Sequence, residues 1–184
     1  LEERLSTLPA DDLLLIERLR DLLFWDRQRN DMTDAEVFDR LEEFLAEVKN
    51  PAARDVAIFR SDLRTIVAAL RRRRLGMGPP TGFGQWVPTI KRNWGDPGLG
   101  LAGRFPWIVK LDRLLATGDL EEANRLVLGI TYEHWARLAS THHFSFEFMV
   151  YYVARWDVLD RWVGRNPDAG KERLKQLVTE AIGE

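Results

Sequence analysis

The side chains best suited to chemistry are the three histidines of the chain, which lie close together in the sequence. His134, His142 and His143 are accompanied by Glu133 and Glu147. Three imidazoles and a carboxylate could bind zinc. However, adjacent histidines on a helix point about 100° apart, and neither H-E-x-x-H nor E-x-x-H spacing is present. The alternative is that the imidazoles cap the ends of two helices, and we therefore expect no metal site.

Other catalytic patterns are missing from the sequence. The chain has no cysteine, which excludes disulfides, thiolate nucleophiles and metals bound by cysteine. It has no G-x-S-x-G motif. Its glycine-rich stretches, 76–84 and 95–100, neither follow a strand nor open a helix with Lys-Ser/Thr, as a P-loop requires. We expect no catalytic residue, no cofactor and no enzymatic activity. The alternative is a helical enzyme domain that binds a ligand or a metal through His134, His142 and His143.

Four consecutive arginines form the most prominent basic run. Such a run could bind phosphate, complement the negative end of a helix dipole or dock onto an acidic protein surface. The net charge of −2 argues against nucleic acid as the partner. Tryptophan is enriched at interface hot spots, so two nearby tryptophans are candidate anchors, although they could instead pack against the core. The predicted partner-binding residues are Arg71, Arg72, Arg73, Arg74, Trp86 and Trp94. Because exposed charges contribute little to stability, we expect the fold to survive replacement of all four arginines by Gln.

The elements that position these residues are predicted to be helices throughout. Apolar residues recur at helical spacing, and no stretch alternates as a strand does. Helix start signals stand at Pro9, Thr33–Glu36, Asn50-Pro51, Pro106, Asp119, Ser145 and Asn166-Pro167. The sequence therefore predicts an all-α bundle of about seven helices. The third of these is expected to run from Pro51 to about Arg74, which places the arginines at its C-terminal end.

A segment rich in glycine and proline divides the predicted helices. Eight of the thirteen glycines lie between Gly76 and Gly103, and five of the eight prolines lie between Pro79 and Pro106. Such density forbids long regular structure, yet the segment is too aromatic for a disordered linker. We predict an ordered connection with one short helix near 85–93. The whole chain, 1–184, is expected to be one domain, made of helices in 1–75, the connection in 76–105 and helices in 106–184.

The helix that begins after Ser145 is predicted to form the centre of the core. Its first half is apolar on all sides, as in helices that are buried all round. We expect Phe148, Tyr152, Val153 and Trp156 to be buried, and truncation of Phe148 to Ala to cost roughly 3–5 kcal/mol.

Targeting signals are not visible in the sequence. No apolar run approaches the roughly 20 residues that a membrane-spanning helix needs, and we find no signal peptide. A cytoplasmic protein is therefore expected. Because the chain begins at Leu1 rather than Met, we also expect a stretch of the protein to precede it.

Three segments, in the right order along the chain, resemble one small bacterial family, the domain of unknown function 2764. They are Leu1–Asp12, Leu63–Arg74 and the stretch from Phe144 to Trp162. This last stretch contains the sequence Phe-Ser-Phe-Glu at 144–147 and the dipeptide Arg-Trp at 155–156 and 161–162. Genes of this family are found among those for bacterial V-type ATPase subunits. The last segment is also similar to the all-helical C-type subunit of these ATPases, which links the central stalk to the membrane ring. The resemblance implies a non-catalytic accessory or stalk-associated protein, peripheral to the membrane through the ATPase.

Overall fold

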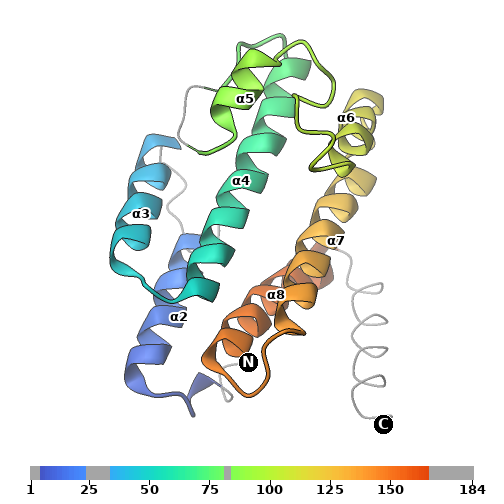
Figure 1. The fold of residues 1–184 in the computed structure, drawn as a ribbon. Helices are drawn as coiled ribbons and strands as arrows, with labels where there is room; N and C mark the ends of the chain where they lie inside the picture. Colours follow the sequence, from blue (N-terminus) through green and yellow to red (C-terminus); the bar gives the residue numbers. More distant parts are fainter. Residues whose placement is uncertain (1–4, 24–33, 81–83, 166–184) are drawn as a thin grey trace. The chain divides into compact units, whose positions relative to one another are not determined.

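The computed structural model of the protein describes residues 5–23, 34–80 and 84–165. These residues form seven α-helices and no strand, which confirms the predicted all-α fold (Figure 1). The helices are α2 (Ala10–Leu23), α3 (Asp34–Glu47), α4 (Pro51–Arg74), α5 (Val87–Arg92), α6 (Trp107–Thr117), α7 (Leu120–Ala139) and α8 (Phe146–Arg165). The predicted helix starts at Thr33 and Asn166 lie outside the described residues.

The chain divides into two compact units, Leu1–Leu126 and Val127–Glu184. The boundary falls inside α7, at a place where the sequence shows no break in helical spacing. The grouping of 1–75, 76–105 and 106–184 into one domain stays a prediction. None of the helices in the described part of the chain is both long and apolar enough to span a bilayer.

Helix α4 is the central element of the first unit, and it packs against α2 and α6. It starts where the sequence predicts, because Asn50 Oδ1 accepts a hydrogen bond from the Ala53 amide at 3.0 Å and Pro51 occupies the first turn. An Asn cap satisfies an amide that would otherwise have no partner in the helix. The buried apolar side chains of α4 are Ala52, Ala53, Val56, Ala57, Leu63, Ile66, Ala69 and Leu70.

Two arginines fix α3 against its neighbours in the first unit. Arg18 of α2 donates to Glu47 Oε2 at 2.6 Å, and its guanidinium carbon lies 5.9 Å from the centroid of the Phe44 ring. Arg54 of α4 donates to the Val48 carbonyl, just beyond the end of α3, at 2.9 Å. Carbonyls at a helix C-terminus have no partner within the helix, so Arg54 joins the end of α3 to α4.

The connection between α4 and α6 is ordered where it is described, as predicted, and it holds the short helix α5 within the expected range 85–93 (Figure 1). Ile90 and Leu99 of this connection are fully buried. Leu99 has a φ of 55°, a left-handed conformation that is uncommon outside glycine. Asp96 Oδ2 accepts a hydrogen bond from the Gly100 amide at 2.7 Å and so closes the loop around Leu99.

Helix α6 ends and α7 begins at the residues that the sequence indicates. Gly118, with a φ of 75°, forms the left-handed cap of α6. Asp119 Oδ1 then accepts a hydrogen bond from the Glu122 amide at 3.0 Å, which caps α7. The chain therefore passes from one helix to the next through a two-residue connection.

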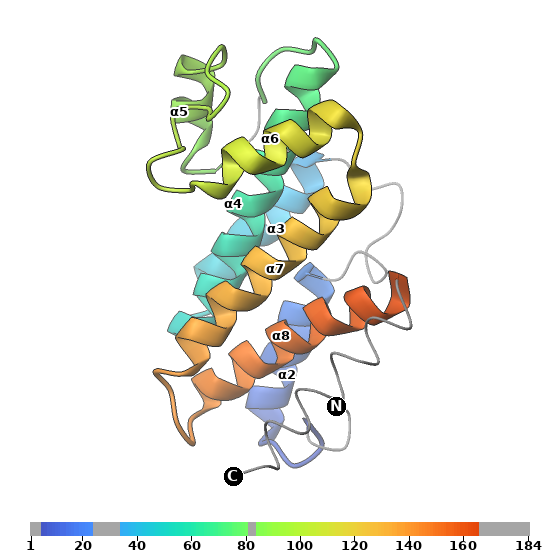
Figure 2. The same ribbon diagram turned by 90° about the vertical axis from the view of Figure 1, so that its right-hand side faces the viewer.

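In the described part of the second unit, α8 forms a hairpin with the part of α7 from Val127 onward (Figure 2). Ser145 Oγ accepts a hydrogen bond from the Phe148 amide at 3.4 Å, in keeping with the predicted cap of α8. Asp157 is buried and binds Arg161 Nε at 2.9 Å, one helical turn further on. This pair has the acid-before-base order that favours helices.

The predicted core positions of α8 are only partly confirmed. Val153 is buried, whereas Phe148, Tyr152 and Trp156 are half-buried. The expectation of burial on all sides is therefore wrong for these three. The buried residues of α8 are Val150, Tyr151, Val153, Ala154, Asp157 and Val158, most of them at the spacing of one helical face. Phe148 and Tyr152 stack on each other with their ring centroids 6.5 Å apart.

Candidate functional site

The four arginines lie at the end of α4, where the helix closes in a Schellman motif. Gly76 has a φ of 68°, the left-handed conformation of this motif. The Met77 amide donates to the Arg72 carbonyl at 2.9 Å, and the Gly76 amide donates to the Arg73 carbonyl at 3.1 Å. Both carbonyls would otherwise lack partners at the helix end. The turn that follows the arginines is therefore fixed by backbone hydrogen bonds.

Arg73 joins three parts of the first unit. Its Nη2 donates to Asp112 Oδ1 in α6 at 2.8 Å and to the Pro97 carbonyl at 3.1 Å, and its Nη1 donates to the Asp96 carbonyl. One guanidinium thus connects the end of α4, the loop at 96–97 and α6. This side chain has a structural role.

Arg74 binds the same carboxylate from the next position along α4. Its Nε lies 3.2 Å from Asp112 Oδ1, and its Nη2 donates to Asp112 Oδ2 and to the Asp112 carbonyl, the latter at 3.1 Å. Asp112 is 5% exposed, so two guanidinium groups neutralise one buried carboxylate. This finding differs from the expectation that all four arginines can be replaced without loss of the fold.

Arg71 and Arg72 have far fewer internal contacts. Within the described residues, the exposed side chain of Arg71 has no hydrogen bond or ion pair, while its backbone carbonyl accepts a bond from the Leu75 amide. Arg72 Nε donates to the Gly78 carbonyl at 3.0 Å, which uses one of the five N–H donors of a guanidinium. Of the four predicted arginines, these two are therefore the ones that bind no carboxylate of the described residues and keep at least four of their five N–H donors for a partner.

Trp86 is held in place by contacts within the first unit. Its Nε1 donates to Asp62 Oδ2 of α4 at 2.9 Å, and its ring meets the Phe105 ring edge to face at 5.4 Å. The Arg104 guanidinium lies 5.5 Å from the centroid of the same ring. Trp86 is half-buried and makes these contacts within the fold, and its role as a partner anchor stays a prediction. Trp94, the other predicted anchor, is half-buried.

Asp62 anchors the residues before α5 to α4. Its Oδ2 accepts hydrogen bonds from Gln85 Nε2 at 2.5 Å and from Trp86 Nε1. Burial raises the pKa of the Asp62 carboxyl above its ordinary 3.8, since desolvation outweighs these hydrogen bonds and the nearby charge of Arg104, which lower it. The folded protein therefore keeps a proton on this carboxyl to a higher pH than the unfolded chain does.

Positive charge is concentrated in residues 71–113, here called the basic segment. The segment contains nine arginines and lysines and two aspartates, whereas the chain as a whole has a net charge of −2. Of the two aspartates, Asp112 is bound by Arg73 and Arg74, and Asp96 accepts a backbone hydrogen bond. The exposed cations are Arg71, Arg74, Lys91, Arg92, Arg104, Lys110 and Arg113. The basic segment therefore has a net charge of about +7, and all of it lies in the first unit.

Two apolar side chains are exposed beside these cations. Leu75 is 74% exposed and Met77 is 45% exposed. Both lie in the turn that ends α4, directly after the arginines. Arginine and methionine are both enriched at protein interfaces, which makes this turn a candidate contact surface.

The histidines do not form a common site. His142 Nδ1 lies 3.0 Å from the Leu138 carbonyl near the end of α7, and its ring packs against Tyr151. His134 Nδ1 lies 3.3 Å from Arg137 Nη2, and His143 is exposed. His142 therefore caps a helix end, as the alternative prediction proposed.

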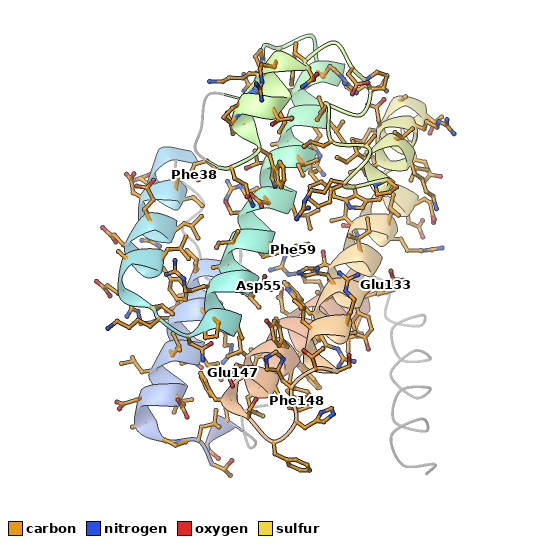
Figure 3. All side chains as sticks on the ribbon, in the orientation of Figure 1. Phe38, Asp55, Phe59, Glu133, Glu147 and Phe148 are labelled. Atoms are coloured by element: carbon orange, nitrogen blue, oxygen red, sulfur yellow. The ribbon has the colours of Figure 1, made fainter. Side chains whose placement is uncertain are left out.

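The carboxylates near the histidines are also separated. Figure 3 shows Glu133 on α7 and Glu147 on α8 well apart. Among the described residues, the fold brings together no group of three His, Asp or Glu side chains that could share a metal ion. The histidine cluster of the sequence is thus not a cluster of ligands in the described structure.

The residues that sequence reasoning missed are Asp62, Arg104 and Asp112. A signal for Asp112 was present, because it directly follows Leu111 and lies one turn after Ile108 on the buried face of α6. An acidic residue on an apolar face, within a segment otherwise rich in cations, requires a buried positive partner. The sequence contains no comparable signal that pairs Asp62 with Trp86.

Comparison with known proteins does not add to this picture. The chain matches no protein-family model, no curated protein and no solved structure. The candidate surface therefore stands on its geometry and charge.

Proposed function

We propose that this protein is a non-catalytic interaction protein that docks its basic segment onto an acidic surface of a protein partner. The observation that carries the proposal is the excess of seven positive charges over residues 71–113, in a chain whose net charge is −2. Local charge of one sign steers association with a surface of the opposite sign.

The contact is assigned to Arg71 and Arg72, because Arg73 and Arg74 are bound to Asp112. A guanidinium presents a planar fork that pairs with a carboxylate through two parallel hydrogen bonds. Arg71 is exposed, and Arg72 is held near the surface by its bond to Gly78. Two carboxylates of the partner are expected to face these side chains.

The resemblance of three segments to the V-type ATPase-associated family supports a partner among the subunits of that enzyme. We propose an accessory or stalk-associated role, similar to that of the C-type stalk subunit, on the cytoplasmic side. Such a role needs rigid helices and a docking surface and requires no catalytic residue.

The test is co-purification of ATPase subunits from native cells at low salt. Wild type is compared with Arg71→Gln/Arg72→Gln and with a control, Arg40→Gln/Lys49→Gln, which removes the same charge from exposed positions outside the basic segment. We expect wild type and control to retain the subunits and the first variant to lose most of them. If the wild type recovers none of the ATPase subunits, the assignment to the ATPase fails. If both variants bind equally well, the basic segment is not the docking surface.

A further inference from the structure

We propose that the tip of α4, residues 71–78, is an amphipathic anchor whose partner is an acidic amphipathic protein helix. Carboxylates of that helix would bind Arg71 and Arg72, and its apolar side chains would cover Leu75 and Met77. The inference rests on the proposed function and specifies the chemistry of the partner.

The first observation is that the tip is held in one conformation. Two backbone hydrogen bonds close the turn, and the bond from Arg72 Nε to the Gly78 carbonyl adds a third link from the helix to the chain beyond it. A surface fixed before binding loses less conformational entropy when a partner docks. Leu75 and Met77 are therefore presented to a partner in a defined position.

The second observation is the spacing of charge and apolar surface along α4. Arg71 and Leu75 are four residues apart, so they lie on the same side of the helix. Their exposure beside one another means that a partner must offer a carboxylate next to an apolar group. Glu and Leu at helical spacing provide that combination, and the flexible side chain of Met77 can adapt to the surface it meets.

Nucleic acid fits the tip less well than a protein. Single strands bind by stacking bases on aromatic side chains, but the Trp86 ring already contacts Phe105 and the Arg104 guanidinium. Leu75 and Met77 offer no ring for stacking, and a phosphate backbone would leave both uncovered. The exposed apolar groups thus favour a protein over a polynucleotide.

A lipid surface also fits the tip less well. Helices that lie in a membrane interface do so with a broad apolar face. Leu75 and Met77 are two residues apart in a tight turn and form no such face. Two such side chains match the narrow apolar stripe of a protein helix better than a lipid surface.

The test measures binding of fluorescent probes to the full chain by anisotropy. The probes are a helical peptide with Glu and Leu at i,i+4 spacing, the same peptide with every Leu replaced by Gln, and a single-stranded RNA. Binding to phosphatidylserine vesicles is measured by co-sedimentation. We expect the Glu/Leu peptide to bind at least about tenfold more tightly than the Glu/Gln peptide. Tighter binding of RNA or vesicles than of the Glu/Leu peptide would overturn the proposal.

Variants separate this inference from the proposed function. Leu75→Gln/Met77→Gln should reduce binding of the Glu/Leu peptide to the level of the Glu/Gln peptide. The control, Leu14→Gln/Leu120→Gln, removes two leucines of similar exposure elsewhere in the unit and should leave binding unchanged.

Arg71→Gln/Arg72→Gln should weaken binding of both peptides. If only the arginine variant has an effect, the apolar anchor is wrong and the basic docking surface stands. If the arginine variant has no effect, the docking surface itself is wrong.

Discussion

Arg74 of α4 and Asp112 of α6 face each other fork to fork, with Arg74 Nε 3.2 Å from Asp112 Oδ1 and Arg74 Nη2 bound to Oδ2. Arg73 binds the same carboxylate from the neighbouring position. The arrangement divides the four consecutive arginines into two functional classes. Arg73 and Arg74 hold the first unit together, and Arg71 and Arg72 remain for a partner.

Replacement of Asp112 by Ala should therefore destabilise the protein strongly. It removes the buried carboxylate and leaves Arg73 and Arg74 without their shared partner. Because the Arg74 side chain is 40% exposed and water can replace part of the contact, we expect a cost of about 1.5–3 kcal/mol. Urea denaturation followed by circular dichroism measures this loss. Arg71→Gln/Arg72→Gln is the control and should change the free energy of unfolding by less than about 1 kcal/mol, since it loses one exposed hydrogen bond, from Arg72 to the Gly78 carbonyl. If both variants lost the same free energy of unfolding, the division of the arginines into a structural pair and a partner-binding pair would be wrong.

Replacement of Asn50 by Ala should cost about 1 kcal/mol in the free energy of unfolding. The Asn50 side chain satisfies the Ala53 amide at the start of α4, and loss of such a cap has a cost of this size. Asn50→Asp keeps an oxygen in the same place and should unfold close to wild type in the same urea experiment. A loss for Asp as large as that for Ala would show that the cap is not the cause.

Two glycine-to-alanine substitutions should change the stability of the protein in opposite directions. Gly76 has a φ of 68°, where a Cβ atom is strained, so Gly76→Ala should destabilise by about 1 kcal/mol. Gly129 lies inside α7, and a Cβ atom added there meets nothing within 4 Å. Gly129→Ala should therefore stabilise by about 0.5–1 kcal/mol. Thermal melting of both variants distinguishes the two directions, and a stabilising Gly76→Ala would contradict the role of the left-handed turn.

Replacement of Asp62 by Asn should change how stability depends on pH. The folded-state pKa of Asp62 is raised above 3.8, so this group lowers the free energy of unfolding as pH rises from 3.8 through the raised value. Asn cannot ionise and avoids the desolvation of a charge. We expect Asp62→Asn to have a higher urea midpoint than wild type at pH 7, with a difference that shrinks below pH 3.8. Asp39→Asn, at an exposed position, is the control and should show no such trend.

The helix boundaries could be predicted because they depend on neighbours in the sequence. Asn50, Asp119 and Ser145 each bind an amide three residues ahead, and this short range makes a cap visible in the sequence. The left-handed end of α6 at Gly118 follows from the same kind of local reasoning.

The contacts of the candidate site could not be predicted in the same way. Arg73 and Asp112 are 39 residues apart in the sequence, and their meeting depends on how α4 and α6 pack. A local pattern therefore identifies a basic helix end but does not show which of its arginines are occupied. The same limit explains the half-burial of Trp156, since the apolar character of a helix does not show how much of it its neighbours cover.

Leu99 is fully buried in a left-handed backbone conformation, and this combination restricts which residues evolution can place there. Glycine adopts the conformation easily but leaves the core unfilled, whereas valine and isoleucine fill space but carry a branched Cβ that the conformation excludes. Asn tolerates the backbone but would bury an amide. Leucine, followed by the left-handed Gly100, is therefore expected to persist among relatives of this chain whose surfaces have diverged. The Leu-Gly pair could serve as a marker for recognising them.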